Sequence, residues 1–378
     1  MAAAQTAIGF CCTRGFVPFP PSSESQFDKD LLEAFGRALR NGSVKVNPGG
    51  SRRRRLDGFL GIVVQNGANI APFIQASGSL KGSTNVTQDP DPDEFNFTKV
   101  DESGKVLVTK VLHPGSGAET PISVIAHPAP LARAHLLFVP QCERLLPHVL
   151  TEETLLHGLG LLSKSSRHDF RLLFDSLAAS SLVNHFHYHG IYLDYASLQG
   201  GKLPLEKVER TLISGDITEG RVAIELLLES QWYVRGFVVS AGHKAGGSSA
   251  DLEALARTAA SLIGEFHRME LPHNVIMAQP STRKTAKIIA STADPSAYIP
   301  TIVTPEVYII PRRPSTEMPA SAGMGATAFE LSGFILALSD EAYAEISEAS
   351  LREVFGSNVS CKGASFDELI CKAAWLSN

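Results

Sequence analysis

Hydrophobic and polar positions follow two kinds of pattern along this chain. Apolar residues at every third or fourth position predict amphipathic helices, and short runs rich in β-branched and aromatic residues predict strands. The helices are expected over 27–40, 151–164, 250–268, 340–355 and 365–376. The strands are expected at 58–65, 104–112, 121–126, 134–139, 171–177, 184–194, 231–240, 273–279 and 306–311.

The order of these elements recurs, although the residues themselves do not repeat. Strand, helix, strand and strand follow one another in 104–194 and again in 231–311. This order predicts an α+β fold of two halves, with mainly antiparallel sheets and packed helices. We expect a flexible leader over 1–25, a first half over 26–205, and a second half over 206–378 that packs on the first.

Composition narrows the class of protein without changing the predicted fold. The 378 residues are 44% hydrophobic and 19% charged, with a net charge of −5, which is typical of a soluble globular protein and does not favour a nucleic-acid partner. The one basic run, Arg52 to Arg55, follows "NPGGS" and is expected to be a solvated loop. Five cysteines without a CxxC pair fit reduced thiols in the cytosol. Neither a signal peptide nor a transmembrane span is predicted, so we expect a cytoplasmic protein without membrane contact.

The segment "NHFHYHGIYLD" (184–194) carries the clearest chemical signal, an imidazole at every second position. Side chains at i, i+2 and i+4 of a strand share one face, so His185, His187 and His189 are expected to line one side. The aromatic residues between them would face the core. Three neutral imidazoles on one face are costly to bury without partners, so a polar ligand is expected beside them.

Two chemistries can use such a face. A zinc site needs three or four ligands converging at about 2 Å; His185 and His187 could begin one, but no second His or Cys cluster stands out. The other chemistry is covalent, because a neutral imidazole is a competent nucleophile near pH 7. Attack on phosphorus gives a phosphoramidate that a second acceptor opens, while the flanking histidines hold phosphate oxygens. This second chemistry needs neither a metal nor a cofactor.

Several motifs bring a family resemblance into view. "NHFHYHGIYL" resembles the triad of the histidine-triad superfamily, in particular its branch of GDP-hexose phosphorylases. "DEFNFTKV" (93–100), "HLLFVP" (135–140) and "FELSGF" (329–334) are similar to stretches of that family. The likeness runs with gaps over about 27–375. His189 at the third triad position is like the animal members, whereas the plant members carry Gln there.

The resemblance implies two histidine-triad-like halves, only the first with a triad, and a two-step guanylyl transfer. His187 would attack the α-phosphorus of GDP-D-glucose and release glucose 1-phosphate, and inorganic phosphate would then convert the GMP–histidine intermediate into GDP. His185 and His189 would orient His187 and bind phosphate oxygens, while Asn184 would fix the strand end. Lys99 in "FNFTKV" could hold a phosphate, or could be an ordinary surface lysine.

The chain also departs from the family pattern near the nucleotide phosphates. Other residues are usual in the family where this chain has Ala134, Asp175, Ala178, Ala179 and Leu182. An aspartate at 175 is expected to repel the phosphates. Ser181 lies an even number of positions before His185, so its hydroxyl would share the triad's face in a continuous strand and could replace the hydroxyl missing at 182.

Other functions remain open at this point. Water in place of phosphate as the acceptor would make the chain a histidine-triad nucleotide hydrolase, and metal ligation would make it a metal-dependent hydrolase. The departures from the family pattern near the nucleotide phosphates also fit a catalytically weak guanine-nucleotide-binding protein. The resemblance favours a nucleotidyltransferase whose partners are a GDP-sugar and inorganic phosphate.

Overall fold

The structure is a computed structural model that describes residues 24–376 apart from internal gaps. The gaps are at 45–50, 57–61, 67–84, 102–103, 114–116, 129, 132, 194–200, 217–220, 243–248, 280–281, 287–297, 303–304, 318–321 and 362. The predicted leader over 1–25 therefore lies almost entirely outside the described residues. Among the described residues, no helix is both long enough and apolar enough to cross a bilayer.

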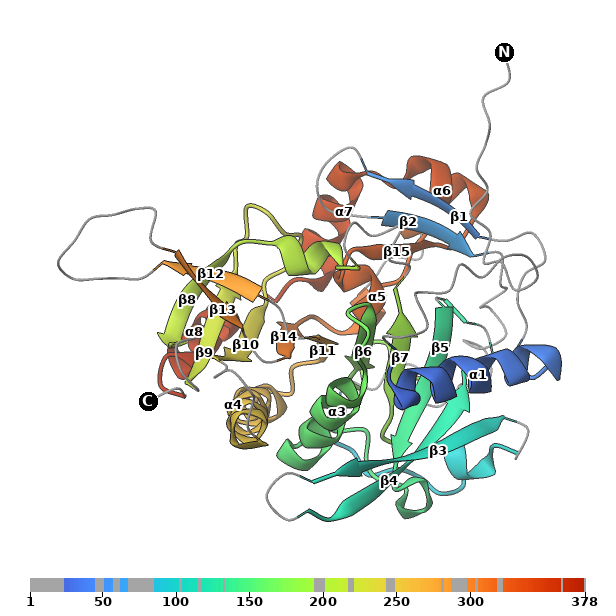
Figure 1. The fold of residues 1–378 in the computed structure, drawn as a ribbon. Helices are drawn as coiled ribbons and strands as arrows, with labels where there is room; N and C mark the ends of the chain where they lie inside the picture. The colour runs from blue at the N-terminus through green and yellow to red at the C-terminus, as the bar shows by residue number, and fades with distance from the viewer. Residues whose placement is uncertain are drawn as a thin grey trace.

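One large antiparallel sheet of ten described strands forms the centre of the molecule (Figure 1). Its strand order is β3–β4–β5–β7–β6–β11–β14–β10–β9–β8. In chain order these strands are β3 (Lys105–Leu112), β4 (Glu119–Ala126), β5 (Arg133–Pro140), β6 (Phe170–Asp175), β7 (Tyr188–Tyr192), β8 (Arg210–Gly215), β9 (Val222–Leu227), β10 (Phe237–Ala241), β11 (His273–Ala278) and β14 (Glu306–Pro311).

The sheet consists of two halves with the same topology. The order β3–β4–β5–β7–β6 in the first half matches β8–β9–β10–β14–β11 in the second. A helix follows the third strand of each half, α3 (Glu152–Lys164) in the first and α4 (Ser249–Arg268) in the second. The halves join where β6 pairs with β11, in a register that places Asp175 opposite Asn274. The predicted fold class, α+β with mainly antiparallel strands in two related halves, is confirmed.

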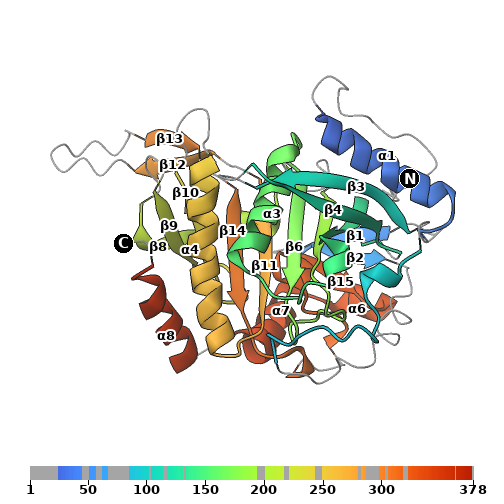
Figure 2. The same cartoon turned by 90° about the horizontal axis from the view of Figure 1, so that it is seen from below.

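Helices cover one face of the large sheet, and smaller elements cover the other. α1 (Gln26–Arg40), α3, α4 and α8 (Ala364–Ala373) contribute to one hydrophobic core, and Figure 2 shows α3 and α4 side by side across this face. α5 (Ala328–Leu331), α7 (Glu348–Val354) and β15 (Phe334–Ala337) pack against the opposite face. Every residue of β6 and β11 is buried, as expected for central strands covered on both sides.

A small sheet joins an early segment of the chain to a late one. Its order is β1 (Ser51–Arg55), β2 (Ile62–Asn66) and β15, with β2 parallel to β15. The predicted loop at Arg52–Arg55 is therefore wrong, because this basic run forms the edge strand β1. Charged residues are common on edge strands, where they discourage further pairing. β12 (Thr282–Ala286) and β13 (Tyr298–Ile302) form a separate two-stranded sheet.

Several predicted elements differ in extent from the observed ones. The helix expected over 340–355 is two short helices, α6 (Asp340–Glu345) and α7, because the Ser347 hydroxyl caps a new helix by accepting from the Ser350 N–H. The strand expected at 231–240 begins only at Phe237. In the strand expected at 58–65, residues 58–61 lie outside the described residues. β8, β9 and β15 were not predicted from the sequence.

Candidate active site

The predicted strand over 184–194 is wrong in its extent, because β7 begins only at Tyr188. The residues before it are tied to a loop instead of a neighbouring strand, and the Phe186 N–H donates to the Leu146 carbonyl at 2.8 Å. The expected division of side chains still holds. Phe186 and Tyr188 belong to the core beneath α3, while the rings of His187 and His189 lie 5.2 Å apart, centroid to centroid, outside that core.

The ring of His187 is held in a single tautomer. Its Nδ1 lies 2.8 Å from the backbone carbonyl of His185, and a carbonyl can only accept, so Nδ1 carries the proton. The lone pair of Nε2 is therefore free. Burial lowers the pKa of His187 to about 4, against the weaker opposing effect of that hydrogen bond, and the ring is neutral at pH 7. These are the properties that a nucleophilic imidazole requires.

His185 presents the opposite tautomer. The Phe97 N–H donates to Nδ1 of His185 at 3.1 Å, so the proton of the neutral ring is on Nε2. Among the described residues that buried Nε2–H makes no hydrogen bond of standard geometry, although the Cys142 carbonyl lies close enough to oppose the lowering of the ring's pKa. Burial first, and then the neighbouring His187, lower the pKa of His185 to about 4. A buried donor that makes no hydrogen bond of standard geometry, next to the ring of His187, is suited to a ligand oxygen.

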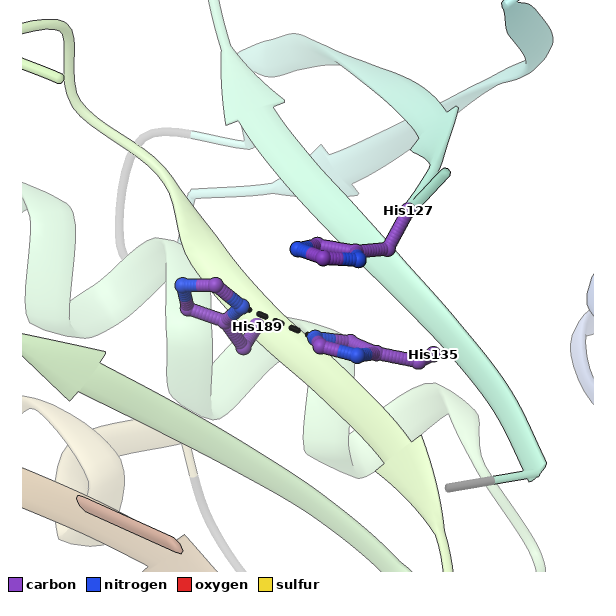
Figure 3. A group of neighbouring side chains, drawn as sticks. All are labelled: His127, His135 and His189. Carbon is purple, nitrogen blue, oxygen red and sulfur yellow. Dashed lines mark hydrogen bonds between the residues drawn. The ribbon is translucent and has the colours of Figure 1, made fainter. Parts of the chain in front are cut away.

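His189 receives its orientation from a histidine on β5 (Figure 3). The Leu131 N–H donates to Nδ1 of His135 at 3.2 Å, which leaves the proton of His135 on Nε2. That Nε2–H donates to Nδ1 of His189 at 2.9 Å, so the proton of His189 is on its own Nε2. Burial is the largest cause that lowers the pKa of both rings, and both are neutral at pH 7.

His127, His135 and His189 form the candidate metal-binding group among the described residues, with ring nitrogens within 4.8 Å of one another. The rings of His127 and His135 are stacked at 4.1 Å with an interplanar angle of 4° (Figure 3). Imidazole lone pairs lie in the ring plane, so two parallel stacked rings cannot direct them at one ion. Metal binding would require His127 to rotate and His135 to lose its Nε2 proton. The arrangement fits a stacked, hydrogen-bonded group better than a set of ligands, and the absence of a metal requirement stays a prediction.

Asn184 and Lys99 both bind backbone groups of nearby loops. The Asn184 side chain accepts from the His148 N–H at 3.0 Å and donates to the carbonyls of Gln88 and Asp89. Nζ of Lys99 donates to two loop carbonyls, with the nearer at 2.6 Å. Within the "FNFTKV" segment, Phe97 is the residue that contacts the triad. Its N–H donates to His185, and its ring lies 4.9 Å from that of His187, centroid to centroid.

The alternation argument for Ser181 is wrong, because residues 177–180 form a turn and no strand runs from Ser181 to the triad. The Ser181 hydroxyl donates to the Val183 carbonyl at 3.3 Å. Asp175, at the end of β6, accepts from Nδ2 of Asn274 at 2.5 Å and from the Ala328 N–H at 2.6 Å. Its carboxyl therefore links β6, β11 and α5.

Two of the substituted family positions have unusual backbone conformations. Ala134 has a φ of 45° and Ala178 a φ of 61°, in the left-handed region that glycine adopts without penalty. An L-residue there is less favourable by about 1–2 kcal/mol. The resemblance places glycine at both positions, which is the residue that this backbone favours.

Four further residues around the triad were not identified as such from the sequence. His127 and His135 flank the turn between β4 and β5, and the Phe329 ring of α5 lies 5.4 Å from the His135 ring, centroid to centroid. The fourth is His148, whose ring stacks on that of His187. His148 is an isolated polar residue in the apolar stretch "LLPHVL", a weak signal on its own.

The matched half-sheets and the histidine cluster of the first half define the class, a two-half histidine-triad fold. The same fold occurs in the crystal structure of yeast Ap4A phosphorylase Apa2 in complex with AMP, with a TM-score of 0.53, 13% identity, and coverage of 90% of this chain and 99% of that one. The chain belongs to the GDPGP1-like family. The family models for its N-terminal and C-terminal domains match residues 26–191 and 204–375.

Curated relatives carry GDP-hexose phosphorylase names. GDP-D-glucose phosphorylase 1 of Bos taurus is 25% identical over 86% of this chain and 77% of its own length. The Homo sapiens protein of that name is 31% identical over 49% of this chain, but this alignment spans only 46% of the human sequence. GDP-L-galactose phosphorylase 2 of Arabidopsis thaliana is 25% identical over 52% of this chain and 45% of its own length.

Proposed function

We propose that this chain is a GDP-hexose phosphorylase, a nucleotidyltransferase that converts GDP-D-glucose and inorganic phosphate into GDP and glucose 1-phosphate. The relatives of that name and the family assignment support the activity and its substrates. The observation that carries the proposal is the His187 ring, neutral, with Nδ1 occupied by a backbone carbonyl and Nε2 free.

The first step uses this free lone pair. Nε2 of His187 attacks the α-phosphorus, the bond to the bridging oxygen breaks, and its electron pair leaves with glucose 1-phosphate. The His185 carbonyl stabilises the resulting positive ring through the Nδ1–H. The Nε2–H groups of His185 and His189 are the donors for phosphoryl oxygens on which charge develops.

The second step reverses the bond changes with a new acceptor. An oxygen of inorganic phosphate attacks the same phosphorus, GDP forms, and the electron pair of the N–P bond returns to Nε2 of His187. The Nδ1 proton stays in place in both steps, so the His185 carbonyl accepts the same hydrogen bond from the His187 ring while the N–P bond forms and while it breaks. His135 keeps His189 in the donor tautomer throughout.

Product analysis with and without phosphate tests this proposal. With GDP-D-glucose and phosphate, we expect GDP and glucose 1-phosphate to form, and EDTA to leave the rate unchanged. Without phosphate, we expect one equivalent of glucose 1-phosphate and a GMP adduct on the protein, detected by intact mass. Steady release of GMP without phosphate would instead identify a hydrolase. Loss of activity in EDTA, restored by zinc, would support the metal-dependent alternative.

We also propose the domain division and location that the sequence predicts. The catalytic half would span 26–205 and the triad-less half 206–378, after a leader over 1–25, with the enzyme in the cytoplasm. The matched strand orders of the half-sheets support the division. Limited proteolysis, with mass analysis of the fragments, would test the boundaries, and imaging of a fluorescent fusion would test the location.

A further inference from the structure

The ring of His148 fills the space between the nucleophile and the core. It stacks on His187 with centroids 4.4 Å apart and an interplanar angle of 22°, and on Phe174 at 4.5 Å and 28°. His148 itself is 1% exposed. One face of the nucleophilic ring is therefore covered by a second imidazole.

Two hydrogen bonds fix the position of His148. Its Nε2 lies 2.8 Å from the Asp175 carbonyl and must donate to it, and its backbone N–H donates to Oδ1 of Asn184 at 3.0 Å. Nδ1 is left as a buried lone pair without a partner among the described residues. Burial, and next the neighbouring His187, lower the pKa of His148 well below its ordinary value, so this ring is uncharged at pH 7.

The proposed reaction changes the charge of the ring on which His148 stacks. When Nε2 of His187 forms the bond to phosphorus, the ring keeps its Nδ1 proton and becomes an imidazolium. A cation over the face of a neutral π-system is stabilised by electrostatic attraction, more strongly where water is excluded. His187 is 5% exposed, so this stabilisation acts in a desolvated site.

We propose that His148 is a positioning residue for guanylyl transfer: its neutral ring holds the plane of His187 and stabilises the positive charge of the GMP adduct. This inference rests on the proposed function. It differs from simple packing in one measurable respect, because packing depends on the shape of residue 148, whereas stabilisation of a cation depends on the electron density of its ring face.

Fluorinated side chains separate these two roles. Phenylalanine at 148 keeps a flat ring in the stack, and pentafluorophenylalanine keeps the ring while removing the negative potential of its face. We expect His148→Phe to form the GMP adduct within about threefold of the wild-type rate, and the pentafluoro variant to be about tenfold slower than His148→Phe. His148→Leu, which lacks a ring, should be at least as slow as the pentafluoro variant.

The measurement is single-turnover adduct formation from GDP-D-glucose without phosphate, in the full-length protein. His157→Phe is the matched control, because His157 is also 1% exposed and its ring nitrogens have no hydrogen-bond partners in the described part of the chain, but it lies on α3. This control should keep the wild-type rate. Equal rates for Phe, pentafluorophenylalanine and Leu at 148 would overturn the inference, whereas a wild-type protein that forms no adduct would overturn the proposed function instead.

A measurement on the wild-type fold covers the case in which the variants do not fold. In histidine-labelled protein, the stack should shift the Cε1–H resonance of His187 upfield through the ring current of His148. The resonance is assigned by its loss in His187→Asn. An unshifted resonance would show that the rings are not stacked in solution and would also overturn the inference.

Discussion

The backbone N–H of Phe97 donates a hydrogen bond to Nδ1 of His185 at 3.1 Å. This contact joins two segments that are far apart in the sequence and decides which nitrogen of His185 carries the proton. Because the remaining Nε2–H is buried and makes no hydrogen bond of standard geometry among the described residues, with only the Cys142 carbonyl nearby, His185 can donate to a ligand without a change of tautomer. The same contact also stabilises the fold, since the Phe97 N–H has its acceptor in a buried position.

Replacement of His185 should therefore affect both rate and stability. We expect His185→Ala to slow adduct formation about 100-fold, by loss of a donor to the developing charge. The free energy of unfolding should fall by about 1–3 kcal/mol, because the Phe97 N–H loses its acceptor. Single-turnover kinetics and urea unfolding measure the two effects. The exposed His168→Ala is the control, and a His185→Ala rate close to that of this control would contradict the role.

His187→Asn should abolish adduct formation while the protein remains folded. Asparagine has an amide in place of the imidazole lone pair, so the covalent step cannot occur, and loss of a nucleophile lowers the rate by several orders of magnitude. Intact mass after incubation with GDP-D-glucose checks the adduct, and circular dichroism checks the fold. Retention of more than about a tenth of the activity of a His168→Asn control would remove His187 from its assigned role.

The pH dependence follows from the burial that lowers the pKa of His187 to about 4. The neutral nucleophile is present above that pKa and is lost as the pH falls through it. We expect the rate of adduct formation to be flat between about pH 6 and 8 and to decline only below about pH 5, whereas an exposed histidine would begin to lose activity near 6.5. Circular dichroism at each pH separates this decline from unfolding. A midpoint near 6.5 would contradict the buried, neutral ring.

The buried carboxyl of Asp175 should make the free energy of unfolding fall as the pH rises. Burial raises the pKa of its carboxyl to about 6, so the folded state binds this proton more tightly than the unfolded state. The stabilisation that the protonated carboxyl gives the folded state is fully present below about pH 4 and is lost as the pH rises through about 6. Asp175→Asn should therefore gain stability relative to the wild type as the pH rises, by about 1–3 kcal/mol at pH 8. Urea unfolding at pH 5 and 8 measures this, with the exposed Asp93→Asn as the control.

The two adjacent alanines after β6 should respond differently to glycine. Ala178 has a φ of 61°, so Ala178→Gly relieves backbone strain and should change the free energy of unfolding by between zero and about +1 kcal/mol. Ala179 is fully buried and has no positive φ, so Ala179→Gly should lose about 1 kcal/mol. Thermal unfolding of both variants provides the comparison. Equal losses would mean that the turn at Ala178 is not strained.

The sequence was informative where a periodic pattern extended over several residues. Alternating side chains at His185 to His189 predicted the separation of histidines from aromatic core residues, although His189 is the one histidine of the three that lies in a strand. The length of the strand over 184–194 was overestimated. Apolar content does not show where the backbone stops pairing with a neighbouring strand and hydrogen-bonds to a loop instead. At Phe186, the partner is the loop carbonyl of Leu146.

Residues that act through tertiary contacts gave no comparable signal. His148 and Phe329 reach the triad from a loop and from α5, and no local spacing connects either of them to it. β8 was missed because it is the edge strand of the large sheet, and polar residues at its exposed positions, such as Thr211, weaken the apolar pattern. The pairing of β8 with β9 depends on neighbouring strands, which the sequence alone does not identify.

Phe329 has a consequence for biosynthesis. It lies against the rings of His135 and His189, but it leaves the ribosome well over a hundred residues after them. At ordinary elongation rates this delay is roughly ten seconds or more, which is long compared with the folding of a small domain. During that interval the nascent first half presents its histidines without the aromatic ring that later packs against them. The last synthesised quarter of the chain thus controls when the aromatic packing around the histidine cluster becomes complete.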